Sequence, residues 1–259
     1  MLSTMNEVKV NEIDGAEMVW IPEGEFTIGS SDADIDAILL QHSDWRADWF
    51  AQEKPQRVVS LPGYWIHRDP VTVAQFRACC AATEWRMPTA PEWGWQEDHP
   101  IVNVSWVEVT HYAEWINGAI PTEAQWEKAA RGTDGRTWPW GNTWVPENCS
   151  QATKAKTTEP TGSHPGNISP YGVRDMVGNV WEWCVVAPLG EYDKAPVRTP
   201  IRRTPAGSGH VLRGGSWQST YEAYLRCANR CFECDFQRGK GSYRRPTVGF
   251  RCVVAANFE

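Results

Sequence analysis

Two carboxylates lie seven residues apart in a short glycine-containing segment, Asp175 and Glu182, with Gly178 and Val180 between them. Calcium takes about six to eight oxygen ligands and accepts backbone carbonyls beside carboxylates. A bent loop here would offer the side chains of Asp175 and Glu182 and the carbonyls of Gly178 and Val180 to one calcium ion. The spacing alone fits equally a tight turn whose acids pair with nearby Arg174, and taken alone it favours that simpler interpretation.

Three cysteines follow at close spacing, Cys227, Cys231 and Cys234. Cysteines at the same spacing bind the cofactor cluster of radical enzymes. In those enzymes a long barrel follows the cysteines, whereas only 25 residues follow Cys234 here. Cys252 could complete a zinc site, because zinc takes four sulfur or nitrogen ligands. The sequence favours partly buried free thiols on strands. The histidines show no metal-ligand spacing, and the chain has no phosphate-binding loop or nucleophile elbow.

Short elements must position these side chains. Strands are expected at residues 18–22, 25–29, 58–61 and 64–66, where apolar and β-branched residues lie between turn residues. Helices are expected after three capping residues, with ends near residues 82, 117 and 131: Thr72, Ser105 and Thr122. Beyond Gly132 the pattern predicts short strands separated by turns, including one at residues 138–142.

The composition favours a loop-rich domain. Sixteen Trp, 18 Pro and 21 Gly occur in 259 residues, and Pro and Gly mark turns while Trp fills wide interiors. We therefore expect a single α+β domain, rich in irregular structure. A polar lead-in is expected at residues 1–17 and the domain at 18–259, with a helical insert at 31–52 and a long loop at 187–209.

The charge distribution excludes few partners. The formal net charge is −7, yet residues 194–251 hold twelve Lys and Arg against three acids. A solvated or ion-paired surface is the favoured interpretation, and a face for an anionic partner is the alternative. Nucleic acid is not expected, because no nucleic-acid-binding motif accompanies the charge. Without a signal peptide or an apolar run of ~20 residues, we expect a cytoplasmic protein that does not span a membrane.

Nine segments in a fixed order carry a family resemblance. They are MVWIP (18–22), GEF (24–26), PVTVAQF (70–76), PIVNVSW (100–106), IPTEAQWE (120–127), WPWGN (138–142), YGVRDMVGNVWEW (171–183), VLRGGSW (211–217) and VGFRC (248–252). Together these segments resemble the formylglycine-generating enzyme family, also called the sulfatase-modifying factor family. The resemblance covers nearly the whole chain, although a fold does not dictate a function.

The resemblance implies a C-type-lectin-like fold and changes the interpretation of the acidic segment. In the family, the positions matching Asp175, Gly178, Val180 and Glu182 form a structural calcium site, so one structural calcium ion is expected. A second family calcium site would begin at Asn148. Residues 151–156 read QATKAK and offer no matching Asp, so the second site is not expected.

The family's enzymes carry two redox-active cysteines, five residues apart, that bind copper and oxidise a substrate cysteine. Alignment of the segment that begins at Cys227 places Glu222 where one of these cysteines would lie. The other falls near Gln218 or Ser219. Cuprous copper needs soft thiolate ligands. Copper and formylglycine formation are therefore not expected.

The C-terminal surface, residues 217–246, is the expected binding site of a non-catalytic protein. Tyr, Trp and Arg are the residue types that dominate binding energy at protein interfaces. Some of these side chains are expected to be structural, Trp217 and Arg226 among them. The candidate ligand-binding residues are Trp217, Tyr221, Glu222, Tyr224, Arg226, Arg230, Phe232, Arg238, Tyr243 and Arg244.

The resemblance leaves the partner open. Relatives include the variable proteins of diversity-generating retroelements and modules beside bacterial kinases or caspase-like proteases. We therefore expect a protein partner such as a bacterial protease, kinase or defence-system component. The alternative is a metal-dependent oxidoreductase that acts on a small molecule or peptide through Cys227, Cys231 and Cys234. The aromatic residues Trp45, Trp49 and Phe50 of the insert would also suit docking to a larger assembly, although packing on their own domain is the simpler interpretation.

Overall fold

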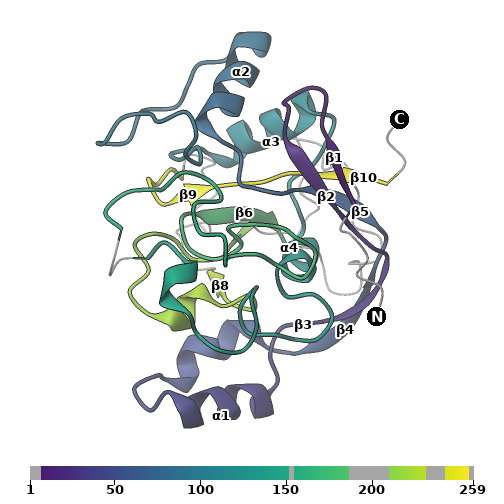
Figure 1. Cartoon of the computed structure of the whole chain (residues 1–259), viewed down its shortest axis with the longest axis vertical. Coiled ribbons are helices and arrows are strands. Elements are labelled where there is room, and N and C mark those ends of the chain that lie inside the picture. The colour runs from purple at the N-terminus through teal and green to yellow at the C-terminus, as the bar shows by residue number, and fades with distance from the viewer. Residues whose placement is uncertain (1–6, 152–154, 187–209, 232–242, 257–259) are drawn as a thin grey trace.

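The computed structural model describes residues 7–151, 155–186, 210–231 and 243–256 (Figure 1). They form a single α+β domain in which short helices and strands are joined by much irregular structure, as the sequence predicts. No helix in these ranges is both long enough and apolar enough to cross a membrane. The predicted long loop at 187–209 lies outside the described residues.

Three small sheets make up the β structure. One four-stranded antiparallel sheet has the order β1 (Val8–Val10), β2 (Glu17–Ile21), β5 (Tyr64–His67) and β10 (Val253–Ala255). A two-stranded sheet pairs β3 (Gly24–Ile28) with β4 (Arg57–Leu61). The third has the order β8 (Arg230–Cys231), β7 (His210–Arg213), β6 (Trp181–Val185) and β9 (Val248–Gly249), and β6 pairs with β9 in parallel. The predicted strands therefore exist, but consecutive strands β2 and β3 belong to different sheets.

The three capped helices form close to where the sequence predicts them. They are α2 (Val73–Thr83), α3 (Trp106–Trp115) and α4 (Glu123–Arg131). Each begins with a capping box, in which the cap side chain and the third helical residue satisfy backbone N–H groups reciprocally. Helix α4 is buried along its whole length and packs against β3, β6 and β7.

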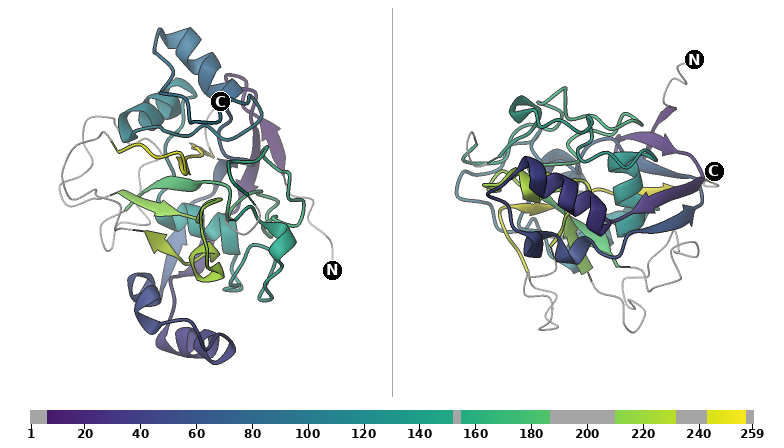
Figure 2. Two further views of the ribbon diagram at one scale, coloured as in Figure 1. Left: turned by 90° about the vertical axis from the view of Figure 1, so that its left-hand side faces the viewer. Right: turned by 90° about the horizontal axis from the view of Figure 1, so that it is seen from below.

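The insert forms a separate lobe at one end of the molecule (Figure 2). It consists of α1 (Asp32–Gln41) and the 3₁₀ helix η1 (Ala47–Glu53). Trp45 and Phe50 are buried and form a cluster with Trp138 and Ala223. These aromatic side chains therefore pack on their own domain.

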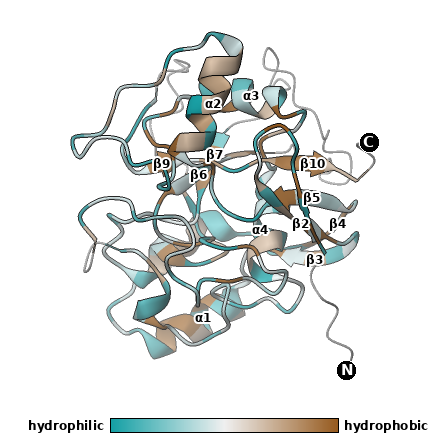
Figure 3. Cartoon of the chain, turned by 45° about the horizontal axis from the view of Figure 1, so that its top comes forward, coloured by the Kyte–Doolittle hydropathy of each residue, from teal (hydrophilic) through white to brown (hydrophobic). Residues whose placement is uncertain are grey.

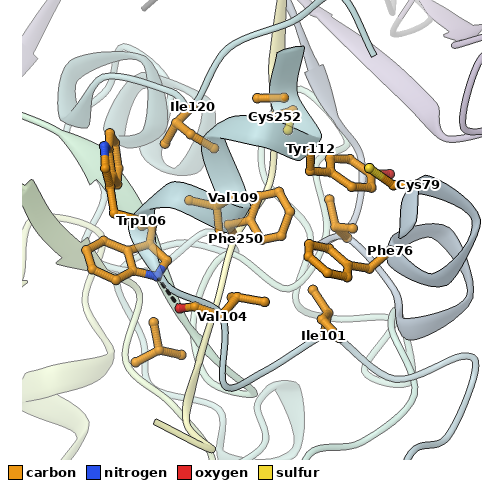
Figure 4. Close-up of a cluster of buried hydrophobic side chains, with 14 of the residues drawn as sticks. Phe76, Cys79, Ile101, Val104, Trp106, Val109, Tyr112, Ile120, Phe250 and Cys252 are labelled. Atoms are coloured by element: carbon orange, nitrogen blue, oxygen red, sulfur yellow. Dashed lines mark hydrogen bonds between the residues drawn. The ribbon is translucent and has the colours of Figure 1, made fainter. Parts of the chain in front are cut away.

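The hydrophobic core has two main clusters. One joins β2, β3 and β5 to α4, and apolar residues occupy much of β2, β5 and β10 (Figure 3). The other packs α2 and α3 on β6, β7 and β9 and is shown in Figure 4. At its centre, Phe76 stacks on Tyr112 with ring centroids 5.8 Å apart, and Phe250 meets both rings edge-on. The two clusters place the C-terminal strands at the middle of the fold.

Part of the predicted lead-in belongs to the fold. Strand β1 pairs with β2, and the turn that follows β1 carries Asp14, whose side chain is buried. The Tyr112 hydroxyl donates to Asp14 Oδ2 at 2.7 Å, and His67 Nε2 lies 3.4 Å from the same oxygen. The polar composition of residues 1–17 concealed this role, because the partners of Asp14 are distant in sequence.

Candidate functional site

A cleft of about 490 Å³ lies between η1 and the segment that follows β7. We call it the C-terminal cleft. The wall formed by η1 contributes Asp48, Trp49 and Gln52. The opposite wall contributes Trp181, Ser216, Gln218, Ser219, Thr220, Tyr224, Asn229, Arg230, Cys231 and Thr247. Most of its side chains are aromatic or uncharged hydrogen-bonding groups.

Buried ion pairs fix the two walls to each other. Arg226 pairs with Glu53 at the end of η1 and lies over the Phe50 ring, 4.3 Å from its centroid. Arg230 Nε lies 2.8 Å from Glu123 Oε2 on α4, and its Nη1 donates to the Gln52 carbonyl at 3.1 Å. Because a buried charge is stable only when it is paired, these contacts hold the cleft walls in one arrangement.

Three aromatic rings form one rim of the cleft. The Trp49 ring centroid lies 5.1 Å from that of Tyr221 and 5.6 Å from that of Tyr224. Tyr221 is 44% exposed, so this rim offers apolar contact area to a ligand. Aromatic pairs at these distances stabilise each other, which keeps the rim rigid.

The predicted ligand-binding residues divide into two groups. Tyr224 and Arg230 line the C-terminal cleft, and Tyr221 extends its rim. Glu222 begins the 3₁₀ helix η4 (Glu222–Leu225) and is partly buried, outside the cleft lining. Phe232 and Arg238 lie outside the described residues.

The remaining predicted residues are engaged elsewhere. Trp217 is buried and donates from Nε1 to the Pro246 carbonyl at 3.2 Å, and Arg226 is 2% exposed. Tyr243 packs edge-on against Trp183, with centroids 6.1 Å apart. Arg244 forms an ion pair with Glu108 on α3. These side chains support the fold around the cleft and do not line it.

The sequence missed the contribution of the insert. Asp48, Trp49 and Gln52 form a wall of the cleft, yet they precede the predicted surface by about 170 residues. The sequence signals were the helical spacing of Trp45 and Trp49 and the aromatic residues that suited docking; Trp45 packs in the core and Trp49 reaches the cleft. Cys231 also lines the cleft, whereas its neighbour Cys227 is fully buried.

The predicted calcium loop is tightly bent. Asp175, Gly178 and Asn179 all have positive φ, of 52°, 79° and 57°. The Asp175 carboxylate is almost fully buried and accepts one hydrogen bond, from the Gly162 N–H at 2.8 Å. Burial raises the pKa of Asp175 to about 6, against the lowering effect of the Gly162 hydrogen bond. A cation beside this carboxylate would offset the cost of its burial.

Further oxygens adjoin the loop. The Asn167 backbone carbonyl accepts from the Asp175 N–H at 3.1 Å, and the Asn167 side chain donates from Nδ2 to the Val177 carbonyl at 2.6 Å. The side-chain Oδ1 of Asn167 is buried without a hydrogen-bond partner. Ser150 accepts from the Asn179 N–H at 3.2 Å, and its hydroxyl is likewise buried and unpartnered. Carboxylate, amide and hydroxyl oxygens are of the ligand class that calcium takes.

Glu182 is already neutralised by a guanidinium. Arg251 donates to Glu182 from Nε and Nη2, both at 2.7 Å, and the Trp126 Nε1–H donates to the same carboxylate at 2.8 Å. Among the described residues, no cluster of three or more His, Cys, Asp or Glu is placed to hold a metal. Calcium at the loop would therefore depend on Asp175 and on neutral oxygens, with Glu182 shared with Arg251.

The cysteines do not converge. Burial raises the pKa of Cys227 to about 12, and burial raises that of Cys252 well above its usual range. Both thiols are fully buried, while Cys231 is partly exposed in the cleft. Cys234 lies outside the described residues. A thiol rather than a thiolate is therefore expected at Cys227 and Cys252 at neutral pH.

Comparison with known proteins gives a consistent result. The model of the sulfatase-modifying factor enzyme 1-like domain matches residues 4–256. The chain is 31% identical to a protein named serine/threonine-protein kinase pkn1 of Chlamydia pneumoniae, over 93% of this chain. It spans only 38% of the length of that relative.

Two further proteins match along most of their lengths. The formylglycine-generating enzyme of Thermomonospora curvata is 29% identical, over 92% of this chain and 93% of the enzyme. The solved structure of PvdO from Pseudomonas aeruginosa superposes with a TM-score of 0.72 at 23% identity, covering 97% of this chain and 99% of PvdO. The nine sequence segments occur in the family's order, and the domain model matches almost the whole length of the chain. The chain therefore belongs to the sulfatase-modifying factor enzyme 1-like family, which includes the formylglycine-generating enzymes.

Proposed function

We propose that this protein is a non-catalytic binding protein that holds its ligand in the C-terminal cleft. The observation that carries the proposal is the chemistry of the cleft wall at Ser216, Gln218, Ser219 and Thr220. By the family resemblance, the enzymes would present redox-active thiols near Gln218 or Ser219. Here the wall offers amide and hydroxyl groups, which form hydrogen bonds with a ligand but do not hold cuprous copper.

The remaining thiols near the cleft do not replace the missing pair. Cys231 lines the cleft, but Cys227 is buried and its pKa is raised to about 12 by burial. Because the thiolate is the form that binds a soft metal or attacks another sulfur, Cys227 is a poor partner for Cys231. This arrangement supports binding over redox catalysis.

A metal-dependent oxidoreductase is the second candidate, and the exposure of Cys231 in the cleft is the observation that favours it. In such an enzyme Cys231 would have to share a metal with Cys234 or with a ligand outside the described residues. Elemental analysis of protein purified without added metal separates the candidates. Copper, iron or zinc near one per chain would favour the enzyme, and loss of that metal in Cys231→Ser would assign it to the cleft.

We further propose that the ligand is a protein. The cleft combines aromatic rings, neutral hydrogen-bonding groups and one buried cation, which is a composition typical of protein-binding surfaces. The Chlamydia pneumoniae relative is named a kinase and is longer than this chain, which supports a kinase as the partner. A bacterial protease or a defence-system component is the alternative partner that the family resemblance suggests. A cytoplasmic location fits such a partner and remains part of the proposal.

Replacing cleft residues is expected to weaken partner binding without unfolding the domain. Trp49→Ala and Tyr221→Ala each remove an aromatic side chain from the rim, and loss of such a side chain costs about 30-fold or more in affinity at a hot spot. The measurement is the affinity of the wild type and of each variant for the partner recovered by affinity purification. Thermal unfolding monitors the fold.

Trp85→Ala is the matched control, because Trp85 is 37% exposed and stacks on His111, outside the cleft lining. Equal losses of affinity in Trp85→Ala and Trp49→Ala would contradict a specific cleft. Unchanged affinity in the double variant Trp49→Ala/Tyr221→Ala would do so as well.

Calcium is expected to raise the thermal midpoint, and we propose Asp175 as the ligand that makes this response possible. A ligand at ~100 times its Kd stabilises the folded state by about 2.7 kcal/mol. In Asp175→Asn the buried carboxylate is lost, so calcium should no longer raise the midpoint. Elemental analysis should find calcium near one per chain. A midpoint that is the same with calcium and with a chelator would contradict the site.

A further inference from the structure

A second hollow of about 310 Å³ lies between α1 and the body of the domain. We call it the α1 cavity. The two hollows have no lining residue in common. Helix α1 contributes Asp34, Ala37, Ile38 and Gln41 at helical spacing, so one face of the helix forms a wall. The volume is at the lower end of the range for ligand pockets, which fits a small metabolite rather than a peptide.

The wall opposite α1 is rich in hydrogen-bond donors. Arg226 donates from Nε to Ala223 and pairs through Nη2 with Glu53, and its Nη1 donates to no described residue. Arg131 uses Nε, Nη1 and Nη2 on three backbone carbonyls and Glu127. Trp138 also lines this wall, but its Nε1–H is buried away from the hollow and is not available to a ligand there. The Nη1 group of Arg226 is therefore the donor on this wall that is left for a ligand.

The α1 wall presents the opposite charge at Asp34, which lines the cavity and is exposed to solvent. Asp34 Oδ2 accepts from Ser31 and from Gln56 Nε2, and no described residue donates to its Oδ1. Burial acts to raise the pKa of Asp34, but the hydrogen bonds from Ser31 and Gln56 and the charge of Arg131 together lower it. Asp34 is therefore ionised at neutral pH, and it is close enough to Arg131 for their charges to interact without a hydrogen bond between them.

Opposite charges on facing walls match a ligand that carries both. We infer that the α1 cavity binds a free α-amino acid. Its carboxylate would accept from Arg226, its ammonium group would donate to Asp34, and its side chain would lie along Ala37 and Ile38. An anion alone would meet guanidinium groups already neutralised by Glu53 and Glu127, so a zwitterion has the better match.

The probes are the proteinogenic L-amino acids, each added singly at millimolar concentration, with binding followed by thermal shift and calorimetry. At least one amino acid should raise the thermal midpoint. Propionate, which lacks the amine, and ethylamine, which lacks the carboxylate, should bind at least about 10-fold more weakly. Failure of every amino acid to bind would overturn the inference, and so would equal binding of either truncated probe.

Asp34→Asn tests the charge assignment, because Asn keeps an oxygen for the Ser31 capping interaction but loses the charge. Amino-acid binding should weaken about 10- to 100-fold. Asp36→Asn is the matched control on the same helix, since Asp36 is exposed like Asp34 but does not line the cavity. Equal affinities of the two variants would assign the binding elsewhere. Partner binding at the C-terminal cleft can fail without affecting this result.

Discussion

Arg251→Met is expected to lower the free energy of unfolding by about 3–5 kcal/mol, because it leaves the buried Glu182 carboxylate without its counter-charge. Both side chains are almost completely buried, and two hydrogen bonds of 2.7 Å join them. Arg251 also donates to the carbonyls of His67, Arg68 and Arg174, at 3.0–3.2 Å, and these hydrogen bonds would be lost, although the Arg68 carbonyl keeps the Arg174 N–H as a donor. Denaturant unfolding monitored by tryptophan fluorescence measures the loss.

An exposed ion pair provides the control. Arg77 and Glu97 lie 2.8 Å apart with roughly half of each side chain exposed, and Arg77→Met should change stability by less than about 1 kcal/mol. The double variant Glu182→Met/Arg251→Met should be less destabilised than the sum of the two single variants, since neither charge is then left alone. A loss for Arg251→Met no larger than that for Arg77→Met would refute the role assigned to the pair.

The arginines show what one sequence does not reveal. The basic segment was expected to be solvated or ion-paired, and Arg213, Arg226, Arg230 and Arg251 are all buried and paired. The partner of Arg226 lies 173 residues away. No local pattern links such residues, so the sequence favoured a surface for the basic segment and indicated a structural role for Arg226 alone among these four.

Local signals predicted local structure well. Capping residues Thr72, Ser105 and Thr122 fixed the starts of α2, α3 and α4, because a capping box depends only on residues three apart. Strand pairing was not predictable in the same way. Strand β5 pairs with β2 and β10, whose residues are separated by more than 200 positions. Alternation of apolar residues indicates a strand but does not identify its neighbour.

The sequence predicted one wall of the C-terminal cleft but not the other, because local patterns do not show which distant segments meet. Tyr224 and Arg230 belong to the segment whose composition indicated binding, and both line the cleft. Asp48, Trp49 and Gln52 lie in an acidic insert whose spacing indicated a helix and whose aromatic residues suited docking to another protein, but nothing linked it to the C-terminal segment. A cleft between two distant segments becomes visible only when the fold brings them together.

Gly178→Ala is expected to destabilise the domain by about 2–5 kcal/mol through two separate effects. Gly178 has a φ of +79°, where a residue with a Cβ is strained by about 1–2 kcal/mol. A Cβ there would also lie 2.5 Å from the Ser150 carbonyl oxygen and 2.8 Å from Cys149 Sγ. Both neighbours are buried, so relief requires a shift of the backbone, and overpacking of this kind costs about 1–3 kcal/mol.

Gly94→Ala separates these two effects. Gly94 has nearly the same φ, +77°, but a Cβ there would meet no atom within 4 Å. The stability lost in Gly94→Ala should therefore reflect backbone strain alone. The difference in the free energy of unfolding between the two variants then measures the steric conflict at the predicted calcium loop. Equal losses would show that residues 149–150 move aside readily. If instead Gly178→Ala is the more damaging and also abolishes the calcium response, the close packing of residues 149–150 on the loop is what holds Asp175 in position for a cation.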